Sequence, residues 1–150
     1  MPLFNLFKKP FKLQDEVFGA MRFTRFKDAS KNFFECEAFF QPLQREIGLT
    51  IDADETGATK AQKEWYALIQ GKYDTIKTAI TPLLYERLFD WYEGETIEDI
   101  DKEFDLESIG LTRIGGEPVR WSMIYVVKRI DHWATIEFVD LEPRSVLIDG

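Results

Sequence analysis

The sequence predicts a single α+β domain in which a mainly antiparallel sheet packs one face on a helix. The first observation behind this prediction is that residues 59–92 carry apolar side chains at steps of three and four, the spacing of one helix face. The second is that the segments on both sides alternate apolar and polar residues, as half-buried strands do. The expected order is therefore three strands, a long or proline-broken helix and three to four strands, with no linker dividing residues 1–150.

The segment before the first strand, residues 1–13, places Lys8, Lys9 and Lys12 beside several apolar side chains. Lysines next to an apolar helix face are typical of a segment that lies on a membrane surface. Pro10 would interrupt such a helix early, and weak membrane binding usually needs a second signal. We therefore expect an N-terminal arm docked on the domain core, and the alternative is a peripheral membrane or scaffold protein that uses this arm.

Three consecutive antiparallel strands are expected before the helix, over residues 17–26, 33–41 and 46–52. In the second of these, Glu35 and Glu37 share one face with Phe33 and Phe39. If that face is uncovered, its apolar area favours a homodimer.

The helix begins and ends with recognisable signals. Thr59 and Gln62 have the spacing of a capping box, and Gly94 is the expected stop. Pro82 lacks an N–H group and crowds the preceding turn, so we expect a kink there or a second helix capped by Thr81. The stripe expected to face the core comprises Trp65, Leu68, Ile69, Tyr73, Ile76, Ile80, Leu83, Leu84, Leu88 and Trp91.

Three to four strands are expected after the helix, over residues 106–114, 119–128 and 133–141, with a short edge strand over residues 145–148. Gly115 and Gly116 predict a tight turn between the first two strands. Residues 142–144, which contain Pro143, are expected to break the third strand.

Cysteine content and hydropathy restrict the compartment. Cys36 is the only cysteine, so no intramolecular disulfide can form, and its place in an alternating apolar run predicts a buried, inert thiol. No apolar run approaches the roughly 20 residues that span a membrane. The N-terminus lacks the apolar region and cleavage site of a signal peptide. The expected location is the cytoplasm.

Negative charge is concentrated in one segment. Residues 86–107 contain ten acidic and two basic residues, a net charge of −8 that equals the net charge of the whole chain. Phosphate backbones require Lys and Arg, so no nucleic-acid partner is expected there. We expect instead a protein partner with a basic surface. The predicted partner-binding residues are Trp91, Tyr92, Glu93, Glu95, Glu98, Asp99, Asp101 and Glu103. A solvated connector kept soluble by its charge remains an equal alternative.

The sequence carries no recognisable catalytic signature, and we predict no catalytic residue, metal ligand or cofactor. Residues 52–57 begin like a calcium loop, but Lys63 stands where the bidentate glutamate belongs. Glu35 and Glu37, together with the Asp52 and Asp54 turn, define the alternative of a small metal-dependent hydrolase.

The single histidine, His132, is expected in a surface turn between two strands. A serine nucleophile such as Ser122 or Ser145 would need a strained elbow motif, which neither has.

Residues 86–128, ERLFDWYEGETIEDIDKEFDLESIGLTRIGGEPVRWSMIYVVK, resemble a group of small uncharacterised bacterial α+β proteins. The shared layout is a helix that ends in aromatic residues, an acidic connector, a strand and a hairpin. Members of that group are associated with immunity to bacterial polymorphic toxins. The resemblance therefore implies a non-enzymatic, immunity-type inhibitor that docks its acidic surface on a basic partner such as a toxin.

Overall fold

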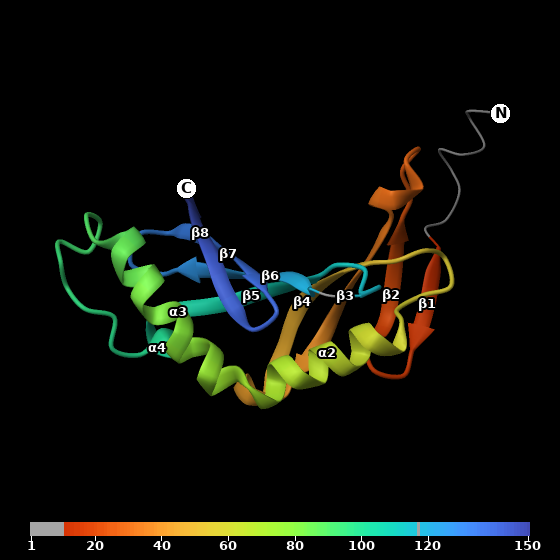
Figure 1. The fold of residues 1–150 in the computed structure, drawn as a ribbon, viewed down its shortest axis with the longest axis horizontal. Helices are drawn as coiled ribbons and strands as arrows, with labels where there is room; N and C mark the ends of the chain where they lie inside the picture. The colour runs from red at the N-terminus through yellow and green to blue at the C-terminus, as the bar shows by residue number, and fades with distance from the viewer. Residues whose placement is uncertain (1–10, 117) are drawn as a thin grey trace.

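The computed structural model describes residues 11–116 and 118–150 and confirms an α+β fold with a mostly antiparallel sheet (Figure 1). In this part of the chain, eight strands lie side by side in sequence order. The strands are β1 (Lys12–Asp15), β2 (Gly19–Thr24), β3 (Phe33–Phe40), β4 (Arg45–Asp52), β5 (Phe104–Leu111), β6 (Arg120–Val127), β7 (His132–Val139) and β8 (Glu142–Asp149). The helices are α2 (Lys60–Gly71), α3 (Tyr73–Leu88) and α4 (Ile100–Glu103).

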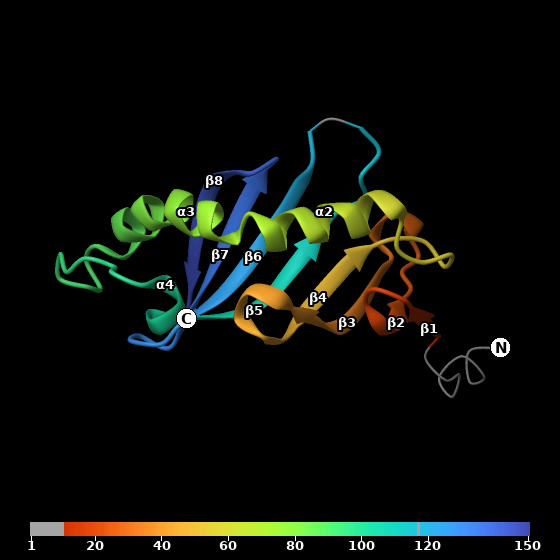
Figure 2. The same ribbon diagram turned by 90° about the horizontal axis from the view of Figure 1, so that it is seen from below.

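Two antiparallel halves of the sheet meet at one parallel pair. β1 to β4 form the first half and β5 to β8 the second, while β4 and β5 run parallel with Gly48 opposite Ser108. Parallel neighbours need a crossover connection, and the segment that contains α2, α3 and α4 provides it, with α2 and α3 running across the strands (Figure 2). Glycine suits position 48 because an added Cβ would lie 3.2 Å from the carbonyl oxygen of Glu107.

The predicted number of strands before the helix is too small. The strand expected over residues 17–26 is β2, and an unpredicted strand, β1, precedes it and begins within the segment expected to be the N-terminal arm. A turn separates the two strands. Asp15 builds this turn, because its carboxylate accepts hydrogen bonds from the N–H groups of Val17 (2.7 Å) and Phe18 (2.9 Å). Gly19 follows with a φ of 73°, a conformation that glycine adopts without strain.

The end of the chain also differs from its prediction. β8 runs over eight residues instead of the short edge strand expected at residues 145–148. Pro143 lies inside β8 opposite Phe138, at an irregularity in the register. β8 is the last strand of the described sheet, and an edge position tolerates proline because no donor is needed on one side.

The connection between β5 and β6 is longer than the predicted tight turn. β5 begins at Phe104 and already ends at Leu111, and β6 begins at Arg120, so Gly115 and Gly116 lie in a loop. The loop includes residue 117, which lies outside the described residues.

The helical segment is broken, but not at the predicted residue. α2 ends at Gly71 and α3 begins at Tyr73, with Lys72 between them at φ −108° and ψ 12°. Gly71 weakens the helix at this point because glycine loses the most backbone freedom on folding. Pro82 lies inside α3, where its exposed ring faces solvent.

The capping box at the start of α2 is confirmed. Thr59 Oγ1 accepts from the N–H of Gln62 at 3.2 Å, and Gln62 Oε1 accepts from the N–H of Thr59 at 2.9 Å. The Gln62 amide also donates to the carbonyls of Asp52 and Thr112, at 2.8 and 3.0 Å. One buried side chain thus joins the helix start to the last residue of β4 and to the residue that follows β5.

The apolar stripe is confirmed for most of the helical segment and is wrong at its ends. Tyr66 and Tyr92 are buried, whereas Leu68 and Trp91 are exposed, and Trp65 and Leu83 are only partly buried. The residues of the stripe that are buried as predicted are Ile69, Tyr73, Ile76, Ile80, Leu84 and Leu88. Contacts with the sheet decide which side of each helix is buried. Tyr66 donates to the Phe39 carbonyl at 2.9 Å, and the Tyr73 and Tyr125 hydroxyls are 2.9 Å apart.

Candidate functional site

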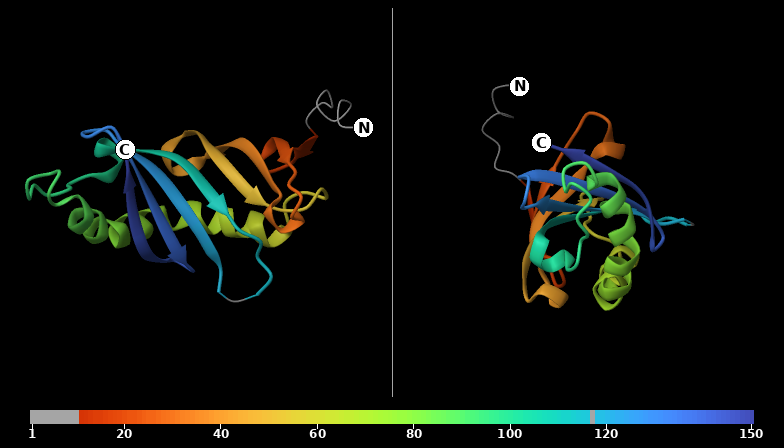
Figure 3. Two further views of the ribbon diagram at one scale, coloured as in Figure 1. Left: turned by 90° about the horizontal axis from the view of Figure 1, so that it is seen from above. Right: turned by 90° about the vertical axis from the view of Figure 1, so that its left-hand side faces the viewer.

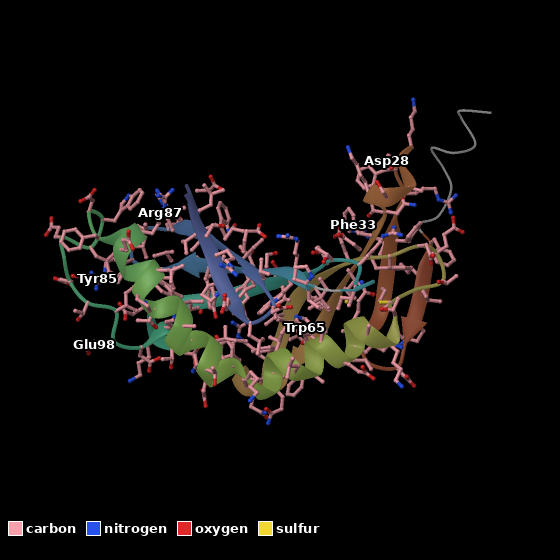
Figure 4. The ribbon with its side chains drawn as sticks, viewed as in Figure 1. Asp28, Phe33, Trp65, Tyr85, Arg87 and Glu98 are labelled. Atoms are coloured by element: carbon pink, nitrogen blue, oxygen red, sulfur yellow. The ribbon has the colours of Figure 1, made fainter. Side chains whose placement is uncertain are left out.

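The connector, residues 89–99, links α3 to α4 and lies at one end of the molecule (Figures 1 and 3). Tyr85 and Arg87 on α3 and Glu98 on the connector mark this end in Figure 4. The connector contains Trp91, Tyr92 and four of the predicted acids, and α4 contains the other two, Asp101 and Glu103.

Backbone hydrogen bonds and aromatic packing give the connector a defined shape. The N–H of Gly94 donates to the carbonyl of Phe89 at 2.9 Å, six residues beyond the end of α3. Glu93 and Gly94 have φ values of 51° and 78°, which reverse the chain. Tyr85 packs edge-on against Phe89, with ring centroids 5.7 Å apart, and donates to the Gly94 carbonyl at 3.3 Å. Ile97, near the other end of the connector, is buried in the core.

Asp101 is engaged inside the protein. Its Oδ2 lies 2.7 Å from Lys77 Nζ, and its Oδ1 accepts from the hydroxyl of Tyr73 at 2.9 Å. Burial opposes the charge of Lys77, but the hydrogen bond and charge of Asp101 outweigh it and raise the pKa of Lys77. Burial, the neighbouring Tyr125 and Asp101 together raise the pKa of Tyr73. The network ties α4 to α3 and β6.

Three other predicted acids also support the connector itself. Glu103 Oε2 accepts from the N–H groups of Glu98 (3.0 Å) and Asp99 (3.3 Å), and Asp99 caps α4 by accepting from the N–H of Asp101 at 3.0 Å. Glu95 pairs with Arg129 at 2.9 Å. These carboxylates hold the segment in place, so they are less available to a partner than the sequence indicates.

Replacing Asp101 by alanine is expected to lower the free energy of unfolding by about 1–2 kcal/mol, because Lys77 and Tyr73 lose their shared acceptor. Chemical denaturation measures this loss. Asp74→Asn is the matched control, since fully exposed Asp74 pairs with the same lysine at 3.3 Å and water screens such a pair, so its loss should be clearly smaller. Equal losses in the two variants would contradict the assignment of Asp101 as a structural residue.

Tyr92, one of the predicted partner-binding residues, is buried. It is only 2% exposed, and the Arg129 guanidinium lies 4.1 Å from its ring centroid. Burial raises the pKa of Tyr92, and its hydroxyl has no hydrogen-bond partner among the described residues. Trp91, one residue earlier, is exposed instead, because consecutive residues of a helical turn point in different directions.

A second group of acids is free of internal ion pairs. Glu86, Asp90, Glu93 and Glu98 are exposed, and none lies within ion-pair distance of a Lys or Arg in residues 11–116 and 118–150. Between them along the chain, Phe89 is 47% and Trp91 48% exposed. From the sequence, Glu86 and Asp90 were assigned to the acidic run but not to the predicted site, and Phe89 was not predicted as a site residue. Its position next to the helix end was the signal that could have identified it.

Trp91 borders a surface hollow of about 750 Å³ between the end of α3 and the edge strand β8. Its ring also lies 6.0 Å from the imidazole of His132, whose Nδ1 is 2.7 Å from the carbonyl oxygen of Ile130. Side chains of both charges line the hollow, which are Glu86, Arg87, Asp90 and Arg144. Arg144 is already paired with Glu142 at 3.0 Å.

The carboxylates considered for a hydrolase do not assemble a metal site in the described residues, where no group of three or more His, Cys, Asp and Glu side chains could hold an ion. Glu35 and Glu37 border one shallow hollow of about 510 Å³, as their shared face predicts, and Glu35 lies 3.8 Å from Arg22. Burial raises the pKa of Asp52.

The calcium-like loop acts as a turn. Asp54 accepts from the N–H of Thr56 at 2.9 Å, as turn-forming aspartates do. Lys63, at the position where a calcium loop needs a glutamate, pairs with Asp15 at 3.0 Å instead.

His132 and the two serines are far apart. His132 is the first residue of β7 rather than a turn residue, while Ser122 and Ser145 both lie opposite Glu137, five residues further along that strand. Five residues of strand span about 17 Å, too far for a hydrogen bond. Cys36 is partly buried, and burial raises the pKa of its thiol to about 12, which disfavours the reactive thiolate.

The predictions for the chain start and the sheet face have different outcomes. Residues 1–10 of the expected arm lie outside the described residues, and Phe11 packs 5.9 Å from Phe23 while remaining partly exposed.

Phe33 and Phe39 do not form one patch, since six residues of strand separate them by about 20 Å with two glutamates between. No helix within the described residues is long and apolar enough to cross a membrane.

Comparisons of the chain with protein-family models, curated proteins and solved structures found no match. The resemblance of residues 86–128 to immunity-associated proteins therefore stays a prediction, and the site geometry is the basis for assigning function.

Proposed function

We propose that this chain is a non-enzymatic protein-binding domain that docks its connector on a basic surface of a partner protein. The observation that carries this proposal is the pair of half-exposed rings, Phe89 and Trp91, among four acids that have no internal ion pair in the described chain. A few residues contribute most of the binding energy at protein interfaces, and tryptophan is enriched among them. Unpaired carboxylates around them attract and orient a basic partner.

The internal hydrogen bonds of the connector favour this function over that of a mere linker. Asp101 and Glu103 already hold the segment against α3 and the β6–β7 turn. A segment that is ordered before binding loses less conformational entropy on association. The acids are thereby divided into one set that positions the connector and another set, Glu86, Asp90, Glu93 and Glu98, that faces outward.

The fold leaves room for a second contact area. We infer that α2 and α3 cover the sheet face that carries the buried strand residues, and that the opposite face is open to solvent. The support is the alternation of the strands, in which buried Met123 and Tyr125 on β6 alternate with partly exposed Ile124 and Val126. The version of this function that the resemblance favours is a cytoplasmic immunity protein that inhibits a basic toxin.

A pull-down from the lysate of the source cell, with elution by a salt gradient and mass spectrometry, tests the proposal. The tagged protein is expected to retain a basic protein that elutes as salt rises, because salt screens exposed charges. The quadruple variant E86Q/D90N/E93Q/E98Q removes the outward acids while keeping every internal pair of the connector, and it is expected to lose this partner.

The matched control is the quadruple variant E16Q/E55Q/E64Q/D74N. It removes the same number of exposed acids outside the connector. The control should retain the partner. Equal retention by both variants, or equal loss from both, would contradict docking through the connector.

A further inference from the structure

Trp133 is a half-exposed aromatic residue on the open face of the sheet, outside the connector. Its side chain is 47% exposed, and it lies opposite Val126 on β6 and Asp149 on β8. The next residue, Ala134, is fully buried on the other face. Alternation along β7 thus places the indole on the face that we infer to be free of helices.

A carboxylate fixes the position of this indole. Trp133 Nε1 donates to Glu107 Oε2 at 2.7 Å, so the side chain reaches across β6 to β5. Glu107 is the extra residue at a register shift between Leu106 and Ser108, and bulges of this kind redirect a side chain. The bond occupies one carboxylate oxygen, and in the described part of the chain Glu107 forms no ion pair. An indole and a carboxylate are therefore held side by side and accessible.

The protein itself shows what such a pair binds. The guanidinium of Arg129 lies 4.1 Å from the ring centroid of Tyr92 while one of its N–H groups donates to Glu95 at 2.9 Å. The ring attracts the delocalised cation, and the carboxylate accepts from its planar edge. Trp133 with Glu107 repeats this combination of ring and carboxylate on an open surface.

The surroundings favour a cation. A shallow hollow beside Glu107 is lined by Glu37, Glu46 and Asp105, with Val126 as an apolar contact. Asp105 pairs with Lys128 at 3.4 Å, and Arg45, which also lines the hollow, donates to the carbonyls of Glu46 and Leu106. Negative charge at this surface matches a basic polypeptide.

We propose that Trp133 and Glu107 form a second binding site, which takes an arginine side chain of a basic polypeptide partner. The guanidinium stacks on the indole and donates to the free oxygen of Glu107. Lysine fits this site less well because its compact ammonium neither stacks on an aromatic ring nor donates two parallel hydrogen bonds to a carboxylate. The inference rests on the proposed function in taking the partner to be a basic protein, but it uses none of the connector residues.

Titration of the ¹⁵N-labelled chain of residues 1–150 with a hexa-arginine peptide tests the site, with the indole N–H signals of the four tryptophans as readout. Trp133→Phe identifies the signal of Trp133 by its loss. That signal is expected to shift saturably with hexa-arginine and to respond more weakly to hexa-lysine at the same ionic strength. Glu107→Gln should weaken binding about two- to fivefold, since its amide oxygen still accepts from the indole while the negative charge is gone.

Glu137→Gln is the matched control, because it removes the same charge from the open face of β7 without touching the indole. It should leave the affinity nearly unchanged. Equal weakening by both glutamine variants, or equal affinity for the arginine and lysine peptides, would show attraction by net charge alone and overturn the site.

The same titration with Trp91→Ala separates this inference from the proposed function. Unchanged behaviour of the Trp133 signal in that variant supports an independent arginine site, whatever the pull-down shows for the connector. Binding that moves only the Trp91 signal and disappears in Trp91→Ala would overturn the Trp133 site and leave the connector proposal standing.

Discussion

Replacing Trp91 by alanine is expected to weaken binding of the basic partner by about 30-fold or more, which corresponds to about 2 kcal/mol at an interface hot spot. Trp91 has the properties of such a residue. It is half exposed, its ring is positioned by the neighbouring His132, and outward acids lie on both sides of it in the chain. Isothermal titration calorimetry with the partner identified in the pull-down measures the change.

Phe26→Ala is the control for this prediction. Phe26 is 44% exposed, and its ring packs 5.8 Å from Phe33, outside the connector. Its removal takes away a comparable aromatic surface and should leave affinity within about twofold, since most contacts outside a hot spot are nearly neutral. A Trp91 variant that binds as tightly as the Phe26 variant would remove the connector from the interface.

Replacing Gln62 by leucine is expected to lower the free energy of unfolding by about 3 kcal/mol, because it leaves three partly buried backbone groups without their partner. The Gln62 side chain is 0% exposed and bonds the N–H of Thr59 and the carbonyls of Asp52 and Thr112. Leucine has a similar volume, so little of the loss is due to packing. The thermal midpoint should fall by about 10 °C in a domain of this size.

The same substitution at Gln70 provides the control. Gln70 is on the same helix, and its amide oxygen accepts one hydrogen bond, from the N–H of Gln41 at 2.8 Å, at an exposed position. Gln70→Leu should therefore cost no more than about 1 kcal/mol. If the two leucine variants unfold at the same denaturant concentration, the link between the helix start and the sheet does not have the assigned role.

The candidate site could be predicted only in part. The acidic run and its exposed tryptophan follow from composition and position in the sequence. The sequence does not show which acids are free to contact a partner. Asp101 pairs with Lys77, 24 residues earlier in the chain, and Glu95 pairs with Arg129, 34 residues later. Likewise, no local pattern predicts that Trp133 meets Glu107 across another strand.

The sequence by itself determined the α+β class, the alternation of most strands, the capping box and the acidic connector. Each of these depends on residues a few positions apart, since helix and strand periods and caps act over one or two turns. Only the tertiary structure decided the parallel pairing of β4 with β5, the helix break at Lys72 and the burial of Tyr92 beneath Arg129. These features depend on which distant segments become neighbours, and the packing of the whole sheet and its helices sets that choice.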